Sequence, residues 1–224
     1  MLVFGKNVLK EIDKKKIRKV YINKNIKDVK IIEYVKNNQL RYTLVDTREL
    51  DRLSHDGVHQ GVVVEINDYE YQKLDVCFKD EFVVILDHLE DPHNFGAIIR
   101  TCEAAGIQSI IIPKDRSVRV NDTVMKTSVG TVENVNIIEV SNIRDAIKKL
   151  QKENFFIYAT AMDGEDYHNV DFSGKKALVI GNEGKGISKI VFDESDFIIK
   201  IPMKGNVNSL NASVAAAVLI FNMI

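Results

Sequence analysis

The sequence of 224 residues contains only two cysteines, Cys77 and Cys102, and they do not have the spacing of metal ligands. Two thiols argue against a disulfide framework, and such sparse cysteine usage is typical of a protein from a reducing cytoplasm. We therefore expect a cytoplasmic protein that binds no metal.

Long hydrophobic runs are also absent. The N-terminal stretch, MLVFGKNVLKEIDKKK, lacks the long apolar core of a signal peptide. Residues 205–224 carry no charge, but Asn and Ser fill their first half, and the apolar remainder is too short to cross a bilayer. The sequence thus predicts a buried helix at this end and no membrane partner.

A third absence is that of a nucleotide-phosphate motif, although residues 179–186 read VIGNEGKG. Their glycine order is G-x-x-G-x-G, whereas the dinucleotide fingerprint is G-x-G-x-x-G and belongs on the first strand of its unit. A P-loop needs Ser or Thr directly after its lysine, and neither follows Lys185. These glycines indicate only a sharp turn or a close approach of the backbone.

The composition is otherwise that of an ordinary globular protein, with 45% hydrophobic and 28% charged residues and a net charge of −1. The charge is unevenly distributed. Residues 1–40 hold eleven Lys/Arg and four Asp/Glu, a charge of +7, so that the remainder carries −8. This basic segment fits either an anionic partner or a solvated helix surface.

Hydrophobic periodicity divides the chain into two α/β parts. Residues 1–72 show helical spacing in three places: at Val8, Leu9 and Ile12, at Val29, Ile32 and Val35, and at Leu50 and Leu53, which mark a short helix. Strand patterns in this part lie at 19–22, 41–45 and 60–66. Weak periodicity at 67–80 indicates a linker, which we place at 73–80. Residues 81–224 show strand patterns at 81–87, 108–113, 136–140, 155–161, 177–181 and 197–201, with helices between several of them. This rhythm predicts a mostly parallel sheet covered on both faces.

Residues 86–107, LDHLEDPHNFGAIIRTCEAAGI, contain a helix capped by Asp91-Pro92 and closed by Gly106. Phe95, Ile98, Ile99, Cys102 and Ala105 share the face that we expect to pack on the sheet. The opposite face carries His93, Gly96, Arg100 and Glu103. Arg100 either meets a ligand that approaches over Gly96 or pairs with Glu103. His88 and His93 are interpreted as local structure or substrate contacts.

Two further stretches are ALVIGNEGKGIS at 177–188 and IIKIPMKGNVNSLNASVAAAVLIF at 198–221. The second begins as a strand, continues as an uncharged Asn/Gly loop and ends in a helix that is apolar on nearly every side, which we expect to be buried all round. Polar groups in a loop over such a helix are costly to bury unless they bind something.

In order and spacing, these three stretches resemble the three motifs of the SpoU/TrmH family of RNA ribose 2′-O-methyltransferases, which stand in this sequence as N-x-G-x-x-x-R, G-N-E-G-x-G and I-P-M-x-G-x-x-x-S-L-N-x-S-V-A. The resemblance covers residues 81–224 closely, and residues 1–72 resemble the small RNA-binding domain of many members. It implies an α/β domain whose last segment forms a trefoil knot, a bound S-adenosylmethionine, a homodimer, and an active site at or near the subunit interface.

The resemblance also implies roles for individual residues. Cofactor contacts are expected near Ile180, Gly181, Ile201, Met203, Ser209 and Leu210. Arg100 matches the catalytic arginine; because a guanidinium is a poor base, we expect it to grip the phosphate of the target nucleotide. The other catalytic positions are Asn94, expected to hold Arg100 or the ribose, Glu183, expected to accept backbone hydrogen bonds, and Ser209 and Asn211, expected to bind substrate or brace the knot.

The preferred interpretation is methylation of a guanosine of 23S rRNA. Lys14, Lys15, Lys16, Arg18 and Lys19 are expected to follow the RNA backbone. Two alternatives remain: a ribose methyltransferase acting on tRNA, and a knotted RNA-binding or ribosome assembly factor without catalysis.

Overall fold

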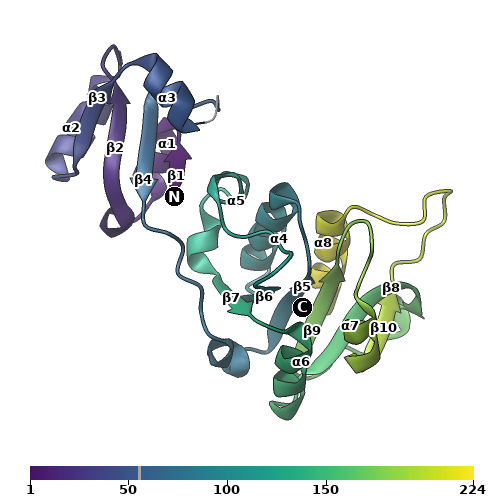
Figure 1. The fold of residues 1–224 in the computed structure, drawn as a ribbon. Coiled ribbons are helices and arrows are strands. Elements are labelled where there is room, and N and C mark those ends of the chain that lie inside the picture. The colour runs from purple at the N-terminus through teal and green to yellow at the C-terminus, as the bar shows by residue number, and fades with distance from the viewer. Residues whose placement is uncertain (55–56) are drawn as a thin grey trace. The chain divides into compact units, whose positions relative to one another are not determined.

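We describe the protein from a computed structural model of the chain. The structure describes residues 1–54 and 57–224. The chain divides into two compact units, one formed by Met1–Glu70 with Val120–Lys126 and the other by Tyr71–Arg119 with Thr127–Ile224. Each unit has its own β-sheet (Figure 1).

The first unit contains a four-stranded sheet of order β1-β4-β2-β3, in which β2 and β3 are parallel and the other pairs antiparallel. Its strands are β1 (Leu2–Phe4), β2 (Ile17–Asn23), β3 (Tyr42–Val45) and β4 (Val62–Ile66). Its helices are α1 (Lys6–Glu11), the 3-10 turn η1 (Lys14–Lys16), α2 (Val29–Asn37) and α3 (Thr47–Ser54). The predicted small α/β part is confirmed.

The buried face of α2 differs from the predicted one. The helix buries Ile31 and Val35, whereas Val29 is 61% exposed. Ile31 and Val35 are one helical turn apart and therefore share a face, while Val29 lies two residues earlier, on the opposite side of the helix.

The second unit is built on a six-stranded parallel sheet of order β10-β8-β9-β5-β6-β7. Its strands are β5 (Phe82–Asp87), β6 (Ser109–Pro113), β7 (Asn136–Val140), β8 (Phe156–Asp166), β9 (Lys176–Gly181) and β10 (Phe197–Lys200). The remaining helices of the chain are α4 (Pro92–Ala104), α5 (Asp122–Thr127), α6 (Ile143–Lys152), α7 (Lys189–Glu194) and α8 (Ala212–Met223), with the 3-10 turns η2 (Leu74–Lys79), η3 (Thr131–Asn134) and η4 (Tyr167–Asn169). The predicted parallel sheet is confirmed.

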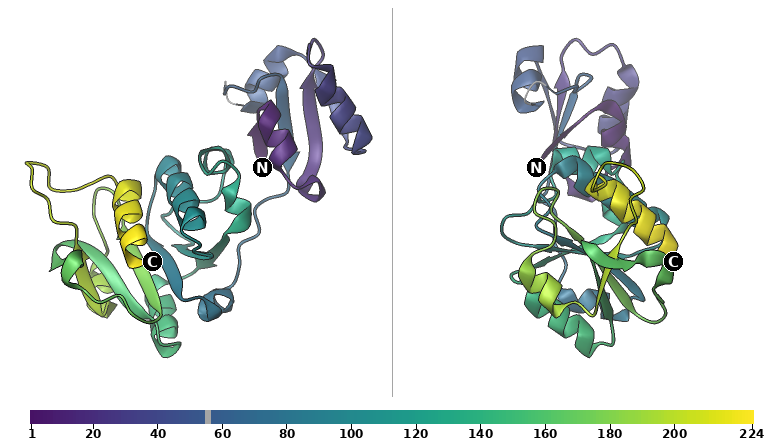
Figure 2. Two further views of the ribbon diagram at one scale, coloured as in Figure 1. Left: turned by 180° about the vertical axis from the view of Figure 1, so that it is seen from behind. Right: turned by 90° about the vertical axis from the view of Figure 1, so that its right-hand side faces the viewer.

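Helices cover both faces of this sheet (Figure 2). One face packs against α6 and α7, where Val83, Ile85 and Val179 join Ile147 and Val191 in one buried cluster. Because side chains alternate along a strand, their neighbours Val84, Leu86 and Ile180 point to the other face. That face is covered by α4 and α8, which contact each other.

Residues 73–80, predicted to be a linker, pack on the second unit. They include η2, and Cys77 is fully buried against the sheet, while Gln72 bridges to Ile138 of β7. Both thiols are free. Burial raises the pKa of Cys77 to about 12 and also raises that of Cys102, so neither thiol is reactive at neutral pH.

The C-terminal helix is less buried than predicted. Ala216, Leu219 and Ile220 of α8 are buried, but Val214 is 48% exposed and Phe221 is 53% exposed. The sheet and α4 cover only one side of a helix that is apolar all round, so its other side remains at the surface of this single chain. Among the described helices, none is both long and apolar enough to cross a membrane.

Candidate active site

The connections that leave β5 and β9 go to opposite faces of the sheet, so a topological switch point lies between these two strands. The two strands are parallel neighbours, with Asp87 of β5 opposite Gly181 of β9. The helices that follow them lie on opposite faces, α4 with α8 and α7 with α6. In open α/β sheets, ligands bind outside the carboxyl ends of strands at such a switch point. The first two motifs of the sequence begin here.

The glycine loop after β9 is a tight hairpin. The backbone N–H groups of Asn182 and Gly186 each donate to the other residue's carbonyl, both at 2.9 Å. The side chain of Asn182 accepts from the backbone N–H groups of Gly184 and Lys185 at 2.9 and 3.1 Å. A Cβ on Gly181 would lie 2.3 Å from the carbonyl carbon of Gly186, so the hairpin closes only over glycine.

Two side chains tie this hairpin to the end of β5. The carboxylate of Asp87, which is 1% exposed, accepts from the backbone N–H of Ser188 at 2.6 Å. The Asn182 amide donates to the carbonyl of His88 at 2.9 Å. Neither periodicity nor motif spacing predicts these contacts of Asp87, Asn182 and Ser188; the only local signal is a polar side chain at the end of a buried strand.

Asn94 and Glu183 connect the first motif to the second. Asn94 lies in the first turn of α4, is 6% exposed, and its amide donates to the Glu183 carboxylate at 3.0 Å. Asn94 was expected to hold Arg100 or the ribose, and Glu183 to accept backbone hydrogen bonds. The structure pairs them with each other, so the buried amide is satisfied by the exposed acid, and the expected roles toward Arg100, the ribose and the backbone stay predictions.

We expect a coupling free energy of about 1 kcal/mol between Asn94 and Glu183, because a hydrogen bond to a charged acceptor stabilises the fold and the exposure of Glu183 reduces the effect. A double-mutant cycle with Asn94→Ala and Glu183→Ala, read from urea unfolding, measures it. Lys185→Ala is the matched control, because Lys185 joins the hairpin through its backbone. Equal coupling in both cycles would contradict the pairing.

Arg100 is exposed on α4. Within the described ranges, neither an ion pair nor a hydrogen bond of its guanidinium is found, and Glu103 accepts instead from Asn134 at 3.4 Å. Gly96, one turn earlier, does not open a path for a ligand. A Cβ there would lie 2.7 Å from the Thr127 side chain, so the chain itself fills this space. The guanidinium therefore remains available to an anion, without an approach over Gly96.

The third motif follows β10 as an extended segment. Residues 201–211 run away from the sheet before α8 begins, as both views show (Figures 1 and 2). Ile201 and Met203 are partly buried, whereas Ser209 and Leu210 are exposed. Asn211 caps α8, its side chain accepting from Ser213 N–H at 2.9 Å. The structure thus does not bury this polar segment, and its threading through a knot stays a prediction.

The comparison with known families identifies the fold and both of its parts. Residues 81–221 match the SpoU rRNA Methylase family, and residues 2–72 match the family described as RNA 2′-O ribose methyltransferase substrate binding. The chain belongs to the SpoU methylase family. It is an RNA 2′-O-methyltransferase of the TrmH type.

Curated relatives match this chain over almost its whole length. It is 41% identical over 235 residues to a protein named putative TrmH family tRNA/rRNA methyltransferase of Staphylococcus aureus, covering 99% of this chain and 94% of that protein. A Bacillus subtilis protein, YacO, carries the same description and is 38% identical over 99% of this chain and 94% of its own length.

Among solved structures, the SpoU methyltransferase AviRb of Streptomyces viridochromogenes, in complex with AdoMet, superimposes with a TM-score of 0.87 at 20% identity. It covers 100% of this chain and 88% of that chain. An AdoMet-bound rRNA methyltransferase of Sinorhizobium meliloti gives a TM-score of 0.81 at 24% identity, covering 99% and 85%. At such identities the likeness establishes the shared fold.

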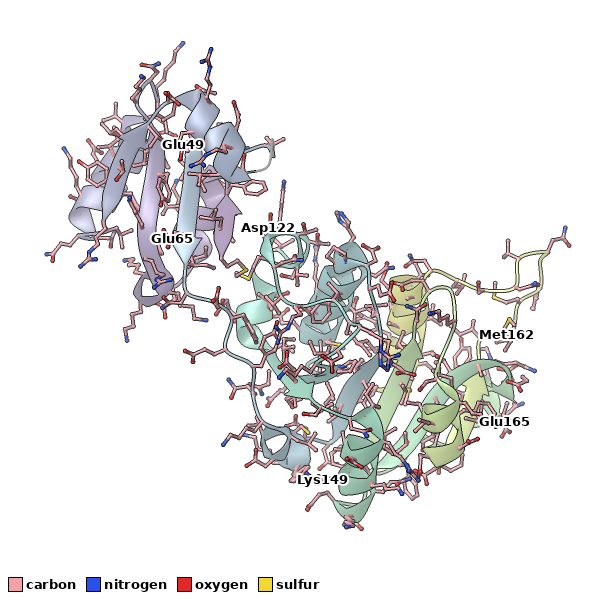
Figure 3. The ribbon with its side chains drawn as sticks, in the orientation of Figure 1. Glu49, Glu65, Asp122, Lys149, Met162 and Glu165 are labelled. Carbon is pink, nitrogen blue, oxygen red and sulfur yellow. The ribbon has the colours of Figure 1, made fainter. Side chains whose placement is uncertain are left out.

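The basic residues predicted to bind RNA lie on η1 and β2 of the first unit. Lys14, Lys15 and Arg18 are exposed, while Lys16 and Lys19 are partly buried. Several of them face other groups. Arg18 lies 4.0 Å from Glu65, which Figure 3 labels on β4, Lys19 lies over the ring of Tyr21, and Lys14 Nζ lies 5.9 Å from the centre of the Tyr34 ring. Lys14 and Lys15 are exposed, and within the described ranges neither forms an ion pair, so both remain available to a polyanion.

Within the described ranges, 1–54 and 57–224, no group of three or more His, Cys, Asp or Glu side chains could hold a metal ion. The groups that the site does offer are an unpaired guanidinium, a buried amide on a carboxylate, and a histidine beside a buried aspartate. A guanidinium and an amide can position a polar substrate, and a histidine can accept a proton from it.

Proposed function

We propose that the protein transfers a methyl group from S-adenosylmethionine to the ribose 2′-hydroxyl of a guanosine in 23S rRNA. The observation that carries this proposal is the Asn94–Glu183 hydrogen bond, which joins the first two SpoU motifs. Arg100 lies on the same helix as Asn94, α4, and is exposed. The family description supports an rRNA substrate.

The residues beside β9 fit an adenosyl or methionine group. Ile180 is buried and apolar, and an added Cβ at Gly186 would meet no atom within 4 Å, so the backbone at Gly186 is open to a ligand. We assign the cofactor contacts to Ile180, Gly181, Ile201, Met203, Ser209 and Leu210. The bound cofactor supplies an electrophilic methyl group, and closure of residues 201–211 over it would also cover the exposed polar segment.

Within this site, Arg100 grips the phosphate of the target nucleotide and so positions its ribose. Asn94 and Glu183 set the distance between α4 and the hairpin, and Asn211 fixes the start of α8. Ser209 contacts the substrate once residues 201–211 have closed.

A homodimer is part of the proposal. The exposed side of α8 presents Val214, Phe221 and Ile224, which are 48%, 53% and 63% exposed. A second copy of the chain would cover this apolar surface, and sedimentation equilibrium measures the resulting mass.

The substrate is tested by mapping 2′-O-methylated nucleotides in total RNA from cells with and without the gene. Loss of one methyl group from 23S rRNA supports the proposal. Loss from tRNA supports the second candidate, since the relatives are described as tRNA/rRNA methyltransferases, which names both substrates. An unchanged map, together with no binding of S-adenosylmethionine, would point to a non-catalytic RNA-binding protein.

The first unit is proposed to bind the RNA backbone. We expect the Lys14→Glu/Lys15→Glu variant to lower the slope of log affinity against log salt by about 1–2, with unchanged cofactor affinity. Filter binding over a salt series measures the slope. The matched control is Lys149→Glu/Lys152→Glu on α6, two exposed lysines of the second unit, one of them labelled in Figure 3. Equal losses in both variants would contradict a specific role for η1.

A further inference from the structure

The ring of His88 lies directly after β5, at the switch point described above. Its Nδ1 lies 2.6 Å from Oδ1 of Asp87. The side chain of Asp87 is 1% exposed, whereas that of His88 is 30% exposed. One edge of the imidazole is therefore anchored on a buried carboxylate, and part of the ring reaches solvent.

The surroundings of Asp87 decide which ring nitrogen carries the proton. Its second oxygen, Oδ2, accepts from the backbone N–H of Ser188 at 2.6 Å, as expected of an ionised carboxylate that only accepts. Nδ1 of His88 is then the donor in the pair. In the neutral imidazole this leaves Nε2 with a free lone pair.

The backbone of His88 is held as firmly as its ring. Its φ is +59°, in the left-handed region that costs a non-glycine residue free energy, and its carbonyl accepts from the Asn182 side chain at 2.9 Å. The hairpin of the second motif therefore fixes the position of this histidine. No packing requirement visible in the sequence calls for a histidine in this conformation.

Other described histidines lack this combination. His59 uses both ring nitrogens, one toward Asp51 and one accepting from Gly61 N–H. His168 pairs with Asp166 at 2.8 Å, but Asp166 is 33% exposed and His168 is 57% exposed, so no buried carboxylate holds this ring. Only at His88 does a buried carboxylate hold an imidazole at the carboxyl end of β5.

Transfer to a ribose hydroxyl requires a proton acceptor, and Arg100 is permanently protonated. We propose that Nε2 of His88 accepts the proton of the target 2′-hydroxyl, with Asp87 as its positioning residue; this rests on the proposed methyl transfer. The hydroxyl oxygen bonds to the methyl carbon, the carbon–sulfur bond breaks, and its electron pair stays on sulfur. The proton passes to Nε2, so the positive charge leaves sulfur and arrives on an imidazolium that faces Asp87.

Several charged groups lie on the elements around His88. Asp87 faces the ring from its own strand, and the hairpin that binds its carbonyl carries Glu183 and Lys185. The segment that donates to the Leu89 carbonyl, through Val118 N–H, follows Lys114, Asp115 and Arg116. Of these groups, the buried Asp87 carboxylate has the recorded contact with the ring.

The test is His88→Asn in the full-length protein. Asn tolerates a positive φ and its amide can replace Nδ1–H as donor to Asp87, but it cannot accept a proton. We expect kcat to fall by about 10²-fold, with unchanged KM for RNA and unchanged affinity for S-adenosylmethionine. The fall of kcat on the acid side of the wild-type pH profile should disappear. His168→Asn, which alters the exposed His–Asp pair, should leave both rate and profile unchanged.

A measurement without turnover tests the tautomer. In the long-range ¹H–¹⁵N spectrum of the cofactor-free protein, the signals of His88, assigned by their loss in His88→Asn, should show a protonated Nδ1 and an unprotonated Nε2. A protonated Nε2 in the neutral ring would overturn the proposal. So would wild-type kcat and pH profile in His88→Asn, or loss of cofactor affinity in that variant, which would mark the residue as structural. If the wild-type protein methylates no RNA, the proposed function fails instead, and the inference falls with it.

Discussion

The Arg100→Ala variant is expected to bind S-adenosylmethionine with wild-type affinity and to methylate RNA with a kcat/KM about 10²–10³-fold lower. The reason is that the guanidinium is exposed and has no partner within the described ranges, so its removal leaves no buried charge and disturbs no packing. The variant loses the hydrogen bonds between the guanidinium and the phosphate of the target nucleotide, which position the ribose hydroxyl. Isothermal titration measures the first quantity, and transfer of a radiolabelled methyl group to RNA measures the second.

Arg100→Lys is the matched variant. It keeps the charge but loses the planar fork that binds two phosphate oxygens at once, so we expect an intermediate loss. Near-normal turnover in Arg100→Ala would rule out the assigned role, and an equal loss in both variants would indicate that the fork rather than the charge is required.

The second large effect is expected from Gly181→Ala. The new methyl group would lie 2.3 Å from the carbonyl carbon of Gly186 and 2.4 Å from the backbone nitrogen of Ile187. Both atoms belong to the backbone, so relief requires the hairpin to open, which breaks the Asn182–Gly186 pair. We expect a loss of about 3 kcal/mol in the free energy of unfolding, together with loss of cofactor binding.

Gly184→Ala provides the control on the same hairpin. Its added Cβ would meet the Asn182 side chain at 3.6 Å, an ordinary contact, so the unfolding free energy should change by less than about 0.5 kcal/mol. Urea unfolding and titration with S-adenosylmethionine measure both variants. If Gly181→Ala were as stable as Gly184→Ala, the close approach in the hairpin would not hold in solution.

Each of these two predictions combines information from the sequence with information from the structure. Gly181 and Arg100 were singled out by motif alone, but the clash distance and the free guanidinium came from the structure. The sequence left two alternatives open for Arg100, a ligand that approaches over Gly96 or a pair with Glu103. Thr127 occupies the space over Gly96, and no Arg100–Glu103 ion pair is found within the described ranges. A glycine pattern reports that something comes close to the backbone, whereas the identity of that neighbour depends on the fold.

The exposed side of α8 is a second case in which a local sequence pattern does not identify the neighbouring surface. A helix that is apolar all round predicts burial, and within a single chain only the side against α4 and β9 is buried. The pattern is local, but the number of surfaces that surround a helix is a property of the assembly.

The sequence by itself determined the local features: the apolar runs that became β5 through β10, the Asp91-Pro92 cap of α4, and the polar residues that follow the strands. Only the tertiary structure decided which of these meet. Asn94 and Glu183 are 89 residues apart, and Asp87 and Ser188 are 101 apart, yet both pairs bond because β9 enters the sheet beside β5. Periodicity describes a segment and its immediate neighbours, whereas strand order is set by the packing of all segments together, so His88, Asp87 and Asn182 become one site only in the folded chain.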